Sequence, residues 1–266
     1  MLCKSYVFIF LACLSDWCAA TLLEVDLPEL PEITPITELP PGLPTCVGRK
    51  ADINECLKNA LNELRPRLKQ GIPELSIPQA DPLVIDLYSI EVVNDVGEGH
   101  LDIHHLITHG ISESIVQNVN MVIDGAHVKL QLLTTSPNIQ KAGTFQGELA
   151  TEGMDLKPHG NFSGNITDLV LNIQLEGDLS VRDGHKYLTM TAIDVYGDIG
   201  DVTFEADNTV PNEKLNKIIL DVINDHWRSL HKVILKETRD TWVPIALNIS
   251  NSYFNAIPFD LFFDTS

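Results

Sequence analysis

The sequence has few basic residues. Its 18 lysines and arginines stand against 37 aspartates and glutamates, and the formal net charge is −19. Nucleic acids and anionic membranes are bound through basic surfaces, so this balance argues against both as partners. Hydrophobic residues still make up 44% of the chain. That share is enough to build a sizeable core, so the composition does not indicate disorder.

A long hydrophobic run is also missing. The first apolar stretch, from Val7 to Leu14, is too short to cross a bilayer. It follows Lys4 and precedes small residues that end at Ala20, which is the order of regions in a secretory signal peptide. We therefore predict a signal peptide over residues 1–20 and a secreted, extracellular protein without stable membrane insertion. The same length argument disfavours a transmembrane anchor.

Cysteine is scarce. The chain has five cysteines, and only Cys46 and Cys56 lie outside the predicted signal peptide. In an oxidising compartment these two are expected to pair as one disulfide that closes a short loop. Such a bridge contributes about 2–4 kcal/mol, so it pins one end of the molecule and does not replace a core. Two thiols are too few for a structural zinc site.

Motifs for chemistry are lacking as well. The sequence contains no Gly-x-Ser-x-Gly nucleophile elbow, and its thiols are expected to be paired. Four histidines, His100, His104, His105 and His109, fall in a segment with the pattern of a strand. There, the first two side chains face away from the last two. We predict no catalytic residue, no metal site and no cofactor, while a pH-sensing role for these imidazoles stays open.

Proline is concentrated near the N-terminus, with six prolines between residues 28 and 44 among acidic residues. Proline this dense prevents a helix or a central strand and favours an extended polyproline II conformation. We interpret residues 21–45 as a proline-rich acidic N-terminal arm. A plain spacer is favoured over a proline-motif ligand for a protein partner. Residues 46–266 are then expected to form one domain.

A short amphipathic helix is predicted after the arm. Apolar residues between positions 53 and 68 follow helical spacing on one face. The Asp52 side chain is expected to cap this helix at its start, Pro66 to kink it, and Gly71 to end it.

From residue 83 to residue 204 the pattern changes to that of strands. Segments rich in β-branched residues are separated by glycine-containing turns, and no window between them has a helical period. Parallel strands would need crossover helices, so we predict an antiparallel sheet. The expected strands include Val84–Val93, Leu101–Ile107, Val119–Ile123, Val128–Leu133, Val170–Leu175, Tyr187–Val195 and Val202–Phe204.

Three asparagines, Asn161, Asn165 and Asn248, lie in sequons and are predicted glycosylation sites of a secreted glycoprotein. In a strand, Asn161 and Asn165 share a face that glycans would force outward. Phe162 and Ile166 would then point inward.

The apolar parity of this strand changes further along. Leu169 and Leu171 carry the apolar positions where the earlier parity would place polar residues. We therefore predict a bend or bulge near Thr167 and Asp168.

The last quarter of the chain is predicted to be helical. A wide apolar stripe begins at Leu215 and resumes past Pro244, so this proline is expected to kink the helix. Residues 212–255 as one helix would be about 65 Å long. A compact globule of this size has a radius of gyration of only about 18 Å. Either the helix bends sharply or the molecule is elongated.

The resulting fold class is α+β. A long curved antiparallel β-sheet would wrap around a long kinked C-terminal helix and leave a hydrophobic tunnel along the seam. A dry apolar cavity attracts apolar guests. A solid core built from the same residues is the alternative, and the pattern alone does not separate the two.

Several residues together resemble the insect takeout and juvenile-hormone-binding protein family. The resemblance covers residues 46–263 and implies the elongated fold of the tubular lipid-binding superfamily, a tunnel for terpenoid or fatty ligands, and no enzymatic activity. The proline-rich arm and the strong acidity depart from the family. The first block is the most specific, because cysteine and proline spacings agree together in Cys46, Cys56, Pro66, Gly71, Pro73, Pro78, Asp81 and Pro82; a looser block holds Ile139, Gly143, Phe145, Gly147 and Gly160, and a C-terminal block holds Trp227, Tyr253, Pro258 and Phe262.

Candidate ligand contacts come from apolar side chains of the two helical regions and the C-terminal end, with two tyrosines that could offer a hydroxyl to a polar ligand group. Each of them is also compatible with a plain core. They are Leu57, Leu61, Leu64, Tyr88, Tyr187, Trp227, Leu230, Ile234, Phe254, Phe259 and Phe262.

The predicted function is that of a monomeric haemolymph carrier for juvenile hormone, another terpenoid or a fatty lipid. The alternative is an extracellular signalling or structural binder that recognises a protein partner through its surface and its acidic arm.

Overall fold

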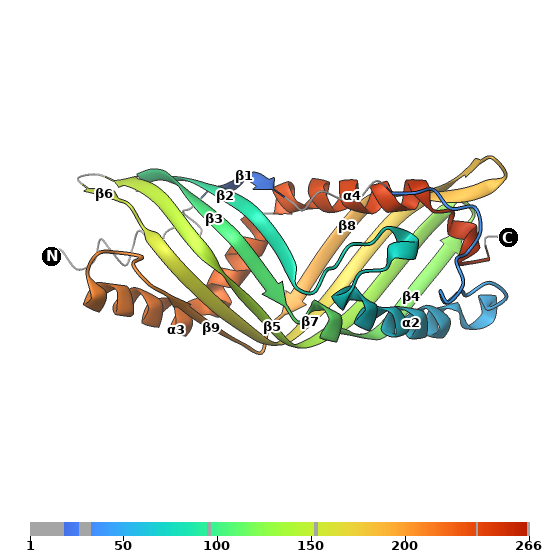
Figure 1. Cartoon of the computed structure of the whole chain (residues 1–266), viewed down its shortest axis with the longest axis horizontal. Helices are drawn as coiled ribbons and strands as arrows, with labels where there is room; N and C mark the ends of the chain where they lie inside the picture. The colour runs from blue at the N-terminus through green and yellow to red at the C-terminus, as the bar shows by residue number, and fades with distance from the viewer. Residues whose placement is uncertain (1–18, 27–32, 95–96, 152–153, 238, 265–266) are drawn as a thin grey trace.

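The computed structural model describes residues 19–26, 33–94, 97–151, 154–237 and 239–264. These residues form an elongated α+β molecule built on one curled antiparallel sheet (Figure 1). The strands are β1 (Ala19–Asp26), β2 (Leu83–Asn94), β3 (Gly97–His109), β4 (Ile115–Asp124), β5 (His127–Thr151), β6 (Met154–Leu156), β7 (His159–Arg182), β8 (His185–Asp198) and β9 (Asp201–Ala206). The helices are α2 (Ile53–Leu64), α3 (Glu213–Glu237) and α4 (Arg239–Ala256), with short 3-10 segments at Lys50–Asp52, Arg65–Lys69, Pro73–Leu75, Ile111–Glu113 and Phe259–Leu261.

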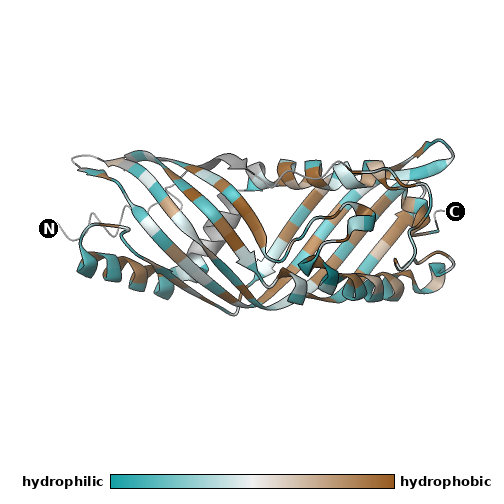
Figure 2. Cartoon of the chain, in the orientation of Figure 1, coloured by the Kyte–Doolittle hydropathy of each residue, from teal (hydrophilic) through white to brown (hydrophobic). Residues whose placement is uncertain are grey.

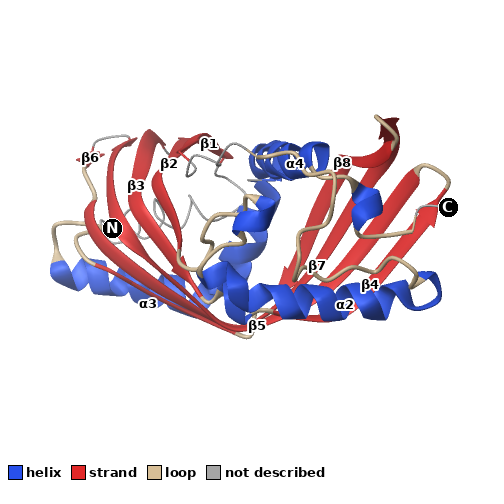
Figure 3. Ribbon diagram, turned by 45° about the vertical axis from the view of Figure 1, so that its right-hand side comes forward, coloured by secondary structure: helices blue, strands red, loops and turns tan. Residues whose placement is uncertain are grey.

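Two long strands, β5 and β7, join the two ends of the molecule. They pair with each other along nearly their whole length, from His127–Asp178 to Gln146–His159. At one end β4 pairs with β5 and β8 pairs with β7. At the other end β3 pairs with β5 and β9 pairs with β7. We call the end with β4 and β8 the α2 half, and the end with β1, β2, β3 and β9 the α3 half (Figure 3).

The long strands turn even-numbered residues inward in one half and odd-numbered residues inward in the other, as the sequence predicts. Near Val128 the even residues of β5 face the core, whereas Ile139 and Phe145 are the buried residues further along. The change coincides with Asp168 of β7, whose φ is +51°. Pairing between β5 and β7 is interrupted there and resumes in unchanged register. A residue in the left-handed region turns the following side chains to the other face, so the predicted bend is confirmed.

The predicted single helix over residues 212–255 is a point of difference. The structure has two helices, and Pro244 lies inside α4 rather than between them. Nor does the sheet wrap around one long helix: α3 begins beside β9 at one end of the molecule and runs toward its middle, while α4 lies along β8 in the other half (Figure 1). The apolar stripe that suggested one helix is instead divided between two edges of the sheet.

The start of α2 also differs from expectation. Asp52 stands at the N-cap position but makes no capping hydrogen bond. Its carboxylate accepts hydrogen bonds from the Arg49 guanidinium instead, with Nε 2.9 Å from Oδ1. Pro66 falls in the 3-10 segment that follows α2, so the regular helix ends at Leu64.

The N-terminal region lies against the domain in the parts that are described. Residues 19–26 form strand β1, which pairs antiparallel with β2. Leu43 is buried, and the Thr34 amide donates to Ser76 Oγ at 3.3 Å. Residues 1–18, most of the predicted signal peptide, lie outside the described residues. Cleavage after Ala20 would fall inside β1, and the division into signal, arm and domain stays a prediction.

Helix asparagines occupy three open edges of the sheet. Strands β4, β8 and β9 each pair with one neighbouring strand, so their outer N–H and C=O groups need other partners. In each case one asparagine amide accepts from the N–H and donates to the C=O of a single edge residue. The pairs are Asn62 of α2 with Val116 (3.0 and 2.9 Å), Asn251 of α4 with Met190 (2.7 and 3.0 Å) and Asn224 of α3 with Phe204 (2.7 and 2.8 Å).

Replacing Asn62 with leucine is expected to lower the free energy of unfolding by about 1–3 kcal/mol, because both backbone groups of Val116 lose their partner. Asn59 lies on the same helix and is exposed, and its amide reaches Glu55 at 3.4 Å. The Asn59→Leu control should therefore change stability by no more than about 0.5 kcal/mol. Urea denaturation measures both variants. Equal stability of the two would show that this edge contact is dispensable.

Candidate ligand-binding cavity

A cavity of about 680 Å³ lies inside the α2 half. Its walls come from α2, β4, β5, β7, β8, the end of α4 and the Phe259–Leu261 segment. Pockets for small molecules have volumes of about 300–1,000 Å³, so this one is large enough for a ligand. Figure 2 shows hydrophobic and hydrophilic residues alternating along these strands, as expected when one face of the sheet is turned inward.

Helix α2 forms one wall through its apolar face. Leu57, Leu61 and Leu64 recur at spacings of four and three residues, which places them on one side of a helix, and all three line the cavity. Leu57 is only 8% exposed and belongs to the core cluster with Cys46, Met121 and other buried residues. The cavity is therefore continuous with the hydrophobic core of this half.

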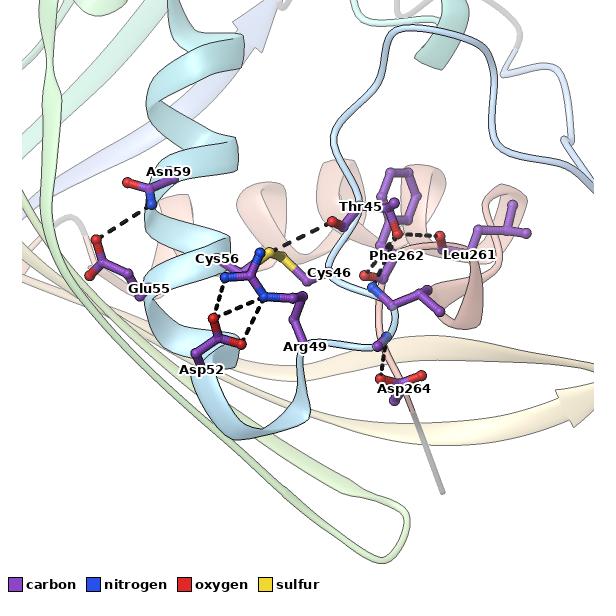
Figure 4. The surroundings of a disulfide bond; sticks show 12 residues. Thr45, Cys46, Arg49, Asp52, Glu55, Cys56, Asn59, Leu261, Phe262 and Asp264 are labelled. Carbon is purple, nitrogen blue, oxygen red and sulfur yellow. Dashed lines mark hydrogen bonds and ion pairs between the residues drawn. A yellow bond between two sulfur atoms is a disulfide. The ribbon is translucent and has the colours of Figure 1, made fainter.

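The segment that precedes α2 and the C-terminal segment meet at the far end of this half, around the disulfide (Figure 4). Cys46 and Cys56 form the predicted disulfide, which ties the N-terminal segment to α2. The Cys46 amide donates to the Phe262 carbonyl at 2.8 Å, and the Thr45 hydroxyl donates to the Leu261 carbonyl at 3.1 Å. Phe259, which is 5% exposed, and Phe262 line the cavity from this side.

Few polar groups reach the cavity. The Ser114 and Ser136 hydroxyls lie 2.6 Å apart. The Tyr253 hydroxyl donates to the Ser76 carbonyl at 3.2 Å, and burial raises the pKa of this tyrosine. Arg65 is the charged residue of the lining, and its Nη1 donates to the Ser112 carbonyl at 2.9 Å. All other lining residues except Thr134 are apolar.

The structure places six of the predicted contact residues in the cavity wall: Leu57, Leu61, Leu64, Phe254, Phe259 and Phe262. Their role in ligand binding stays a prediction.

The remaining predicted contacts lie elsewhere. The Trp227 indole donates to Asp201 Oδ1 at 3.1 Å beside β9, and the Arg182 guanidinium lies 3.9 Å from the centre of the Tyr187 ring. Tyr88 lies on β2 in the α3 half. The side chains of Leu230 and Ile234 lie outside the described residues.

The residues that the strands contribute to the cavity wall were not predicted from the sequence. Strand residues such as Leu130, Leu132 and Ile173 line it, together with Met121 and Met190. The sequence contains a relevant pattern, because alternate residues of each expected strand share a face of the sheet. What the sequence did not provide was the face that each strand turns inward.

The inner face of the α3 half carries two polar residues with perturbed pKa values. Burial raises the pKa of Tyr88 to about 12. Lys141 lies on β5 on the same face as Ile139 and Phe145. Its side chain is exposed, yet the surrounding protein desolvates the ammonium and lowers its pKa. An accessible but partly desolvated lysine is expected on a concave wall.

The sequons and histidines occupy varied settings. Asn161 and Asn248 are exposed, whereas Asn165 is half-buried and its Oδ1 has no hydrogen-bond partner. Glycosylation stays a prediction.

Of the four histidines of β3, His105 Nδ1 lies 3.2 Å from Asp86 and His109 Nδ1 lies 3.9 Å from Asp81. Across the described side chains, no group of three His, Cys, Asp or Glu residues is arranged to hold a metal ion.

No described helix combines the length and hydrophobicity that a transmembrane span requires.

Comparison with known proteins gives one family match and several relatives. A family model described as "Haemolymph juvenile hormone binding protein (JHBP)" matches residues 18–264. The chain is 21% identical over 233 residues to a "Putative beta-carotene-binding protein" of Schistocerca gregaria, covering 84% of this chain and 88% of that protein. It is 23% identical over 251 residues to the "Circadian clock-controlled protein daywake" of Drosophila melanogaster, covering 84% and 89%.

Among solved structures, the chain is similar to Takeout 1 of Epiphyas postvittana. The TM-score is 0.60 at 13% sequence identity, and the match covers 79% of this chain and 96% of that one. At this identity the likeness shows a shared fold. The family resemblance predicted from the sequence is confirmed by these matches.

Removing the disulfide by the double replacement Cys46→Ser and Cys56→Ser is expected to lower the free energy of unfolding by about 2–4 kcal/mol. The bridge restricts the unfolded chain and fixes the end wall of the cavity. Guanidinium denaturation with and without a reductant provides the measurement. Reductant should destabilise the wild type by a similar amount and leave the double variant unchanged. A double variant as stable as the oxidised wild type would contradict this role.

Tyr88 should ionise later than an ordinary tyrosine, whose pKa is about 10. Because folding raises the pKa to about 12, the neutral phenol stabilises the fold fully below about pH 10. This contribution is lost as the pH rises toward 12. In an alkaline titration followed by phenolate absorbance, Tyr88→Phe should remove one phenolate from the highest-pH step only. Loss of amplitude near pH 10 instead would show that Tyr88 is solvated.

Proposed function

The chain belongs to the haemolymph juvenile hormone binding protein family, and on that premise we propose that it is a secreted carrier that encloses a small hydrophobic ligand in the cavity of the α2 half. The observation that carries this proposal is the cavity itself, with a volume of about 680 Å³ and an almost wholly apolar lining. An apolar hollow inside a folded domain gives up packing contacts that a solid core would make. Occupation by an apolar guest restores them.

The energetics are sufficient for a carrier. Burial of apolar groups contributes about 0.8 kcal/mol per methylene, so a ligand with a dozen carbons gains roughly 10 kcal/mol. Association and ordering remove several kcal/mol of that gain. Micromolar to nanomolar dissociation constants follow.

A terpenoid, including juvenile hormone, or a fatty lipid is the ligand class we propose. The family description names juvenile hormone, and the name of the Schistocerca gregaria relative refers to beta-carotene, which is itself a terpenoid. The inner face of the α3 half offers further apolar surface, where Phe162 and Phe204 stack with ring centres 6.0 Å apart. We propose that the tunnel extends toward this surface.

The alternative function, recognition of a protein partner through the acidic arm, has less support. Leu43 is buried, and Cys46 is bonded to both α2 and the C-terminal segment. The described part of the arm is therefore held against the domain. A free tether would leave these groups in solvent.

Two neighbouring leucines of β5 test the carrier directly, because Leu132 lines the cavity while Leu133 is 37% exposed on the opposite face. Leu132→Trp should fill part of the cavity and weaken binding of an apolar fluorescent probe by about tenfold or more, since overpacking costs about 1–3 kcal/mol. Leu133→Trp should bind the probe as the wild type does. Native mass spectrometry before and after organic extraction would identify any co-purified lipid.

Unchanged probe binding by Leu132→Trp would place the ligand outside this cavity. A wild-type protein that neither carries nor rebinds an apolar molecule would contradict the proposed function as a whole.

A further inference from the structure

One residue stands apart from the rest of the cavity lining. Arg65 is the first residue after α2, and among the described residues it is the only charged one that lines the cavity. Figure 1 shows α2 running from the free end of the α2 half toward the middle of the molecule. Arg65 therefore lies at the inner end of the cavity, opposite the end wall formed by the disulfide.

The guanidinium of Arg65 is incompletely satisfied. Its Nη1 donates to the Ser112 carbonyl at 2.9 Å, but its Nε is buried and has no acceptor. No described carboxylate pairs with it, although the chain has 37 acidic residues. Arg67, two positions later, forms an ordinary exposed ion pair with Glu74 at 2.7 Å. Among the described arginines, Arg65 is the one whose buried Nε has no acceptor.

Neighbouring groups hold Arg65 in place. Buried Asp81 accepts from the Ser112 amide at 2.8 Å, the Ser112 hydroxyl at 2.6 Å and the Gly110 amide at 3.1 Å. Burial opposes ionisation of Asp81, but these hydrogen bonds outweigh it and hold the pKa of its carboxyl below the usual value. Ser112 is therefore fixed, and its carbonyl fixes one arm of the Arg65 fork. The Ser114 hydroxyl, two residues along, also lines the cavity.

Arg65 as a residue is half-buried, and its Nε is buried. A buried donor without an acceptor is unfavourable, and so is a cation without a counter-ion beside an apolar lining. A carboxylate satisfies both at once, because it accepts two parallel hydrogen bonds from one edge of a guanidinium and neutralises its charge. With Nη1 already bonded to Ser112, the edge formed by Nε and Nη2 is the one available. An ester or an alcohol offers neither the negative charge nor the second strong acceptor.

We propose that the cavity binds a lipid with a carboxylate head group, whose head is held by Arg65 and whose tail runs along α2 toward Phe259. This assignment rests on the proposed carrier function and names the chemical class of its ligand. Arg65 and Ser114 meet the polar end, and the apolar lining takes the rest.

Palmitate and methyl palmitate have the same tail and differ in the charge of the head group. Competition against a bound fluorescent apolar probe at neutral pH compares their affinities. Wild type should bind palmitate at least about tenfold more tightly than the ester, the contribution expected of a charge-assisted hydrogen bond. Arg65→Gln should abolish this preference by weakening the binding of palmitate. Binding of the fluorescent probe by the same variant reports whether the fold and the cavity are intact.

Arg67→Gln serves as the matched control, because it removes a guanidinium of the same segment that pairs with Glu74 and does not line the cavity, and it should retain the full preference for palmitate. Lys141→Gln tests the other partly desolvated cation and should also retain it. Persistence of the preference in Arg65→Gln, or its loss in Lys141→Gln, would overturn the assignment of the head group to Arg65. Equal binding of acid and ester by the wild type would overturn the ligand class while leaving the carrier function intact. Displacement of the probe by neither compound would also overturn the ligand class, whereas failure of the wild type to bind the probe at all would overturn the carrier function.

Discussion

The open edges of a sheet must find hydrogen-bond partners, and this requirement determines where the described helices lie. Helices α2, α3 and α4 each place an asparagine against an outer strand, where the amide forms the two bonds that another strand would form. Because these helices are held at the edges, they do not fill the concave side of the sheet. In the α2 half the space between α2 and α4 stays hollow, and the cavity is a consequence of how the edges are sealed.

The sequence predicted the fold class and the position of most strands, because β-branched segments and glycine turns are local signals. It also located the change of parity near Asp168 from apolar residues alone. It did not predict that β5 continues to Thr151, since Pro137 and Gly143 interrupt the strand pattern. The division of the C-terminal stripe into α3 and α4 was missed for a different reason. An amphipathic pattern shows that one face is covered, but it does not say by which edge of the sheet.

The residues that line the cavity could be predicted where they lie on helix α2, but not where they lie on strands. Leu57, Leu61 and Leu64 were identified because helical spacing puts them on one face, and the whole face turns inward. Trp227 does not line this cavity, because α3 packs beside β9, where Asp201 accepts from the indole, and its role in ligand binding stays a prediction. The significance of Arg65 could not be seen in the sequence at all. An arginine in an acidic chain has many conceivable partners, and only the fold shows that its Nε is left without one.

The cavity is walled by residues from two segments that are far apart in the sequence, with Cys46 and Leu57 on one side and Phe259 and Phe262 on the other. The end wall is therefore complete only after two segments that are far apart in the sequence have met, which makes its closure a long-range event of folding. Until that contact forms, the apolar lining is open to solvent, and exposed apolar surface of this kind promotes aggregation of folding intermediates.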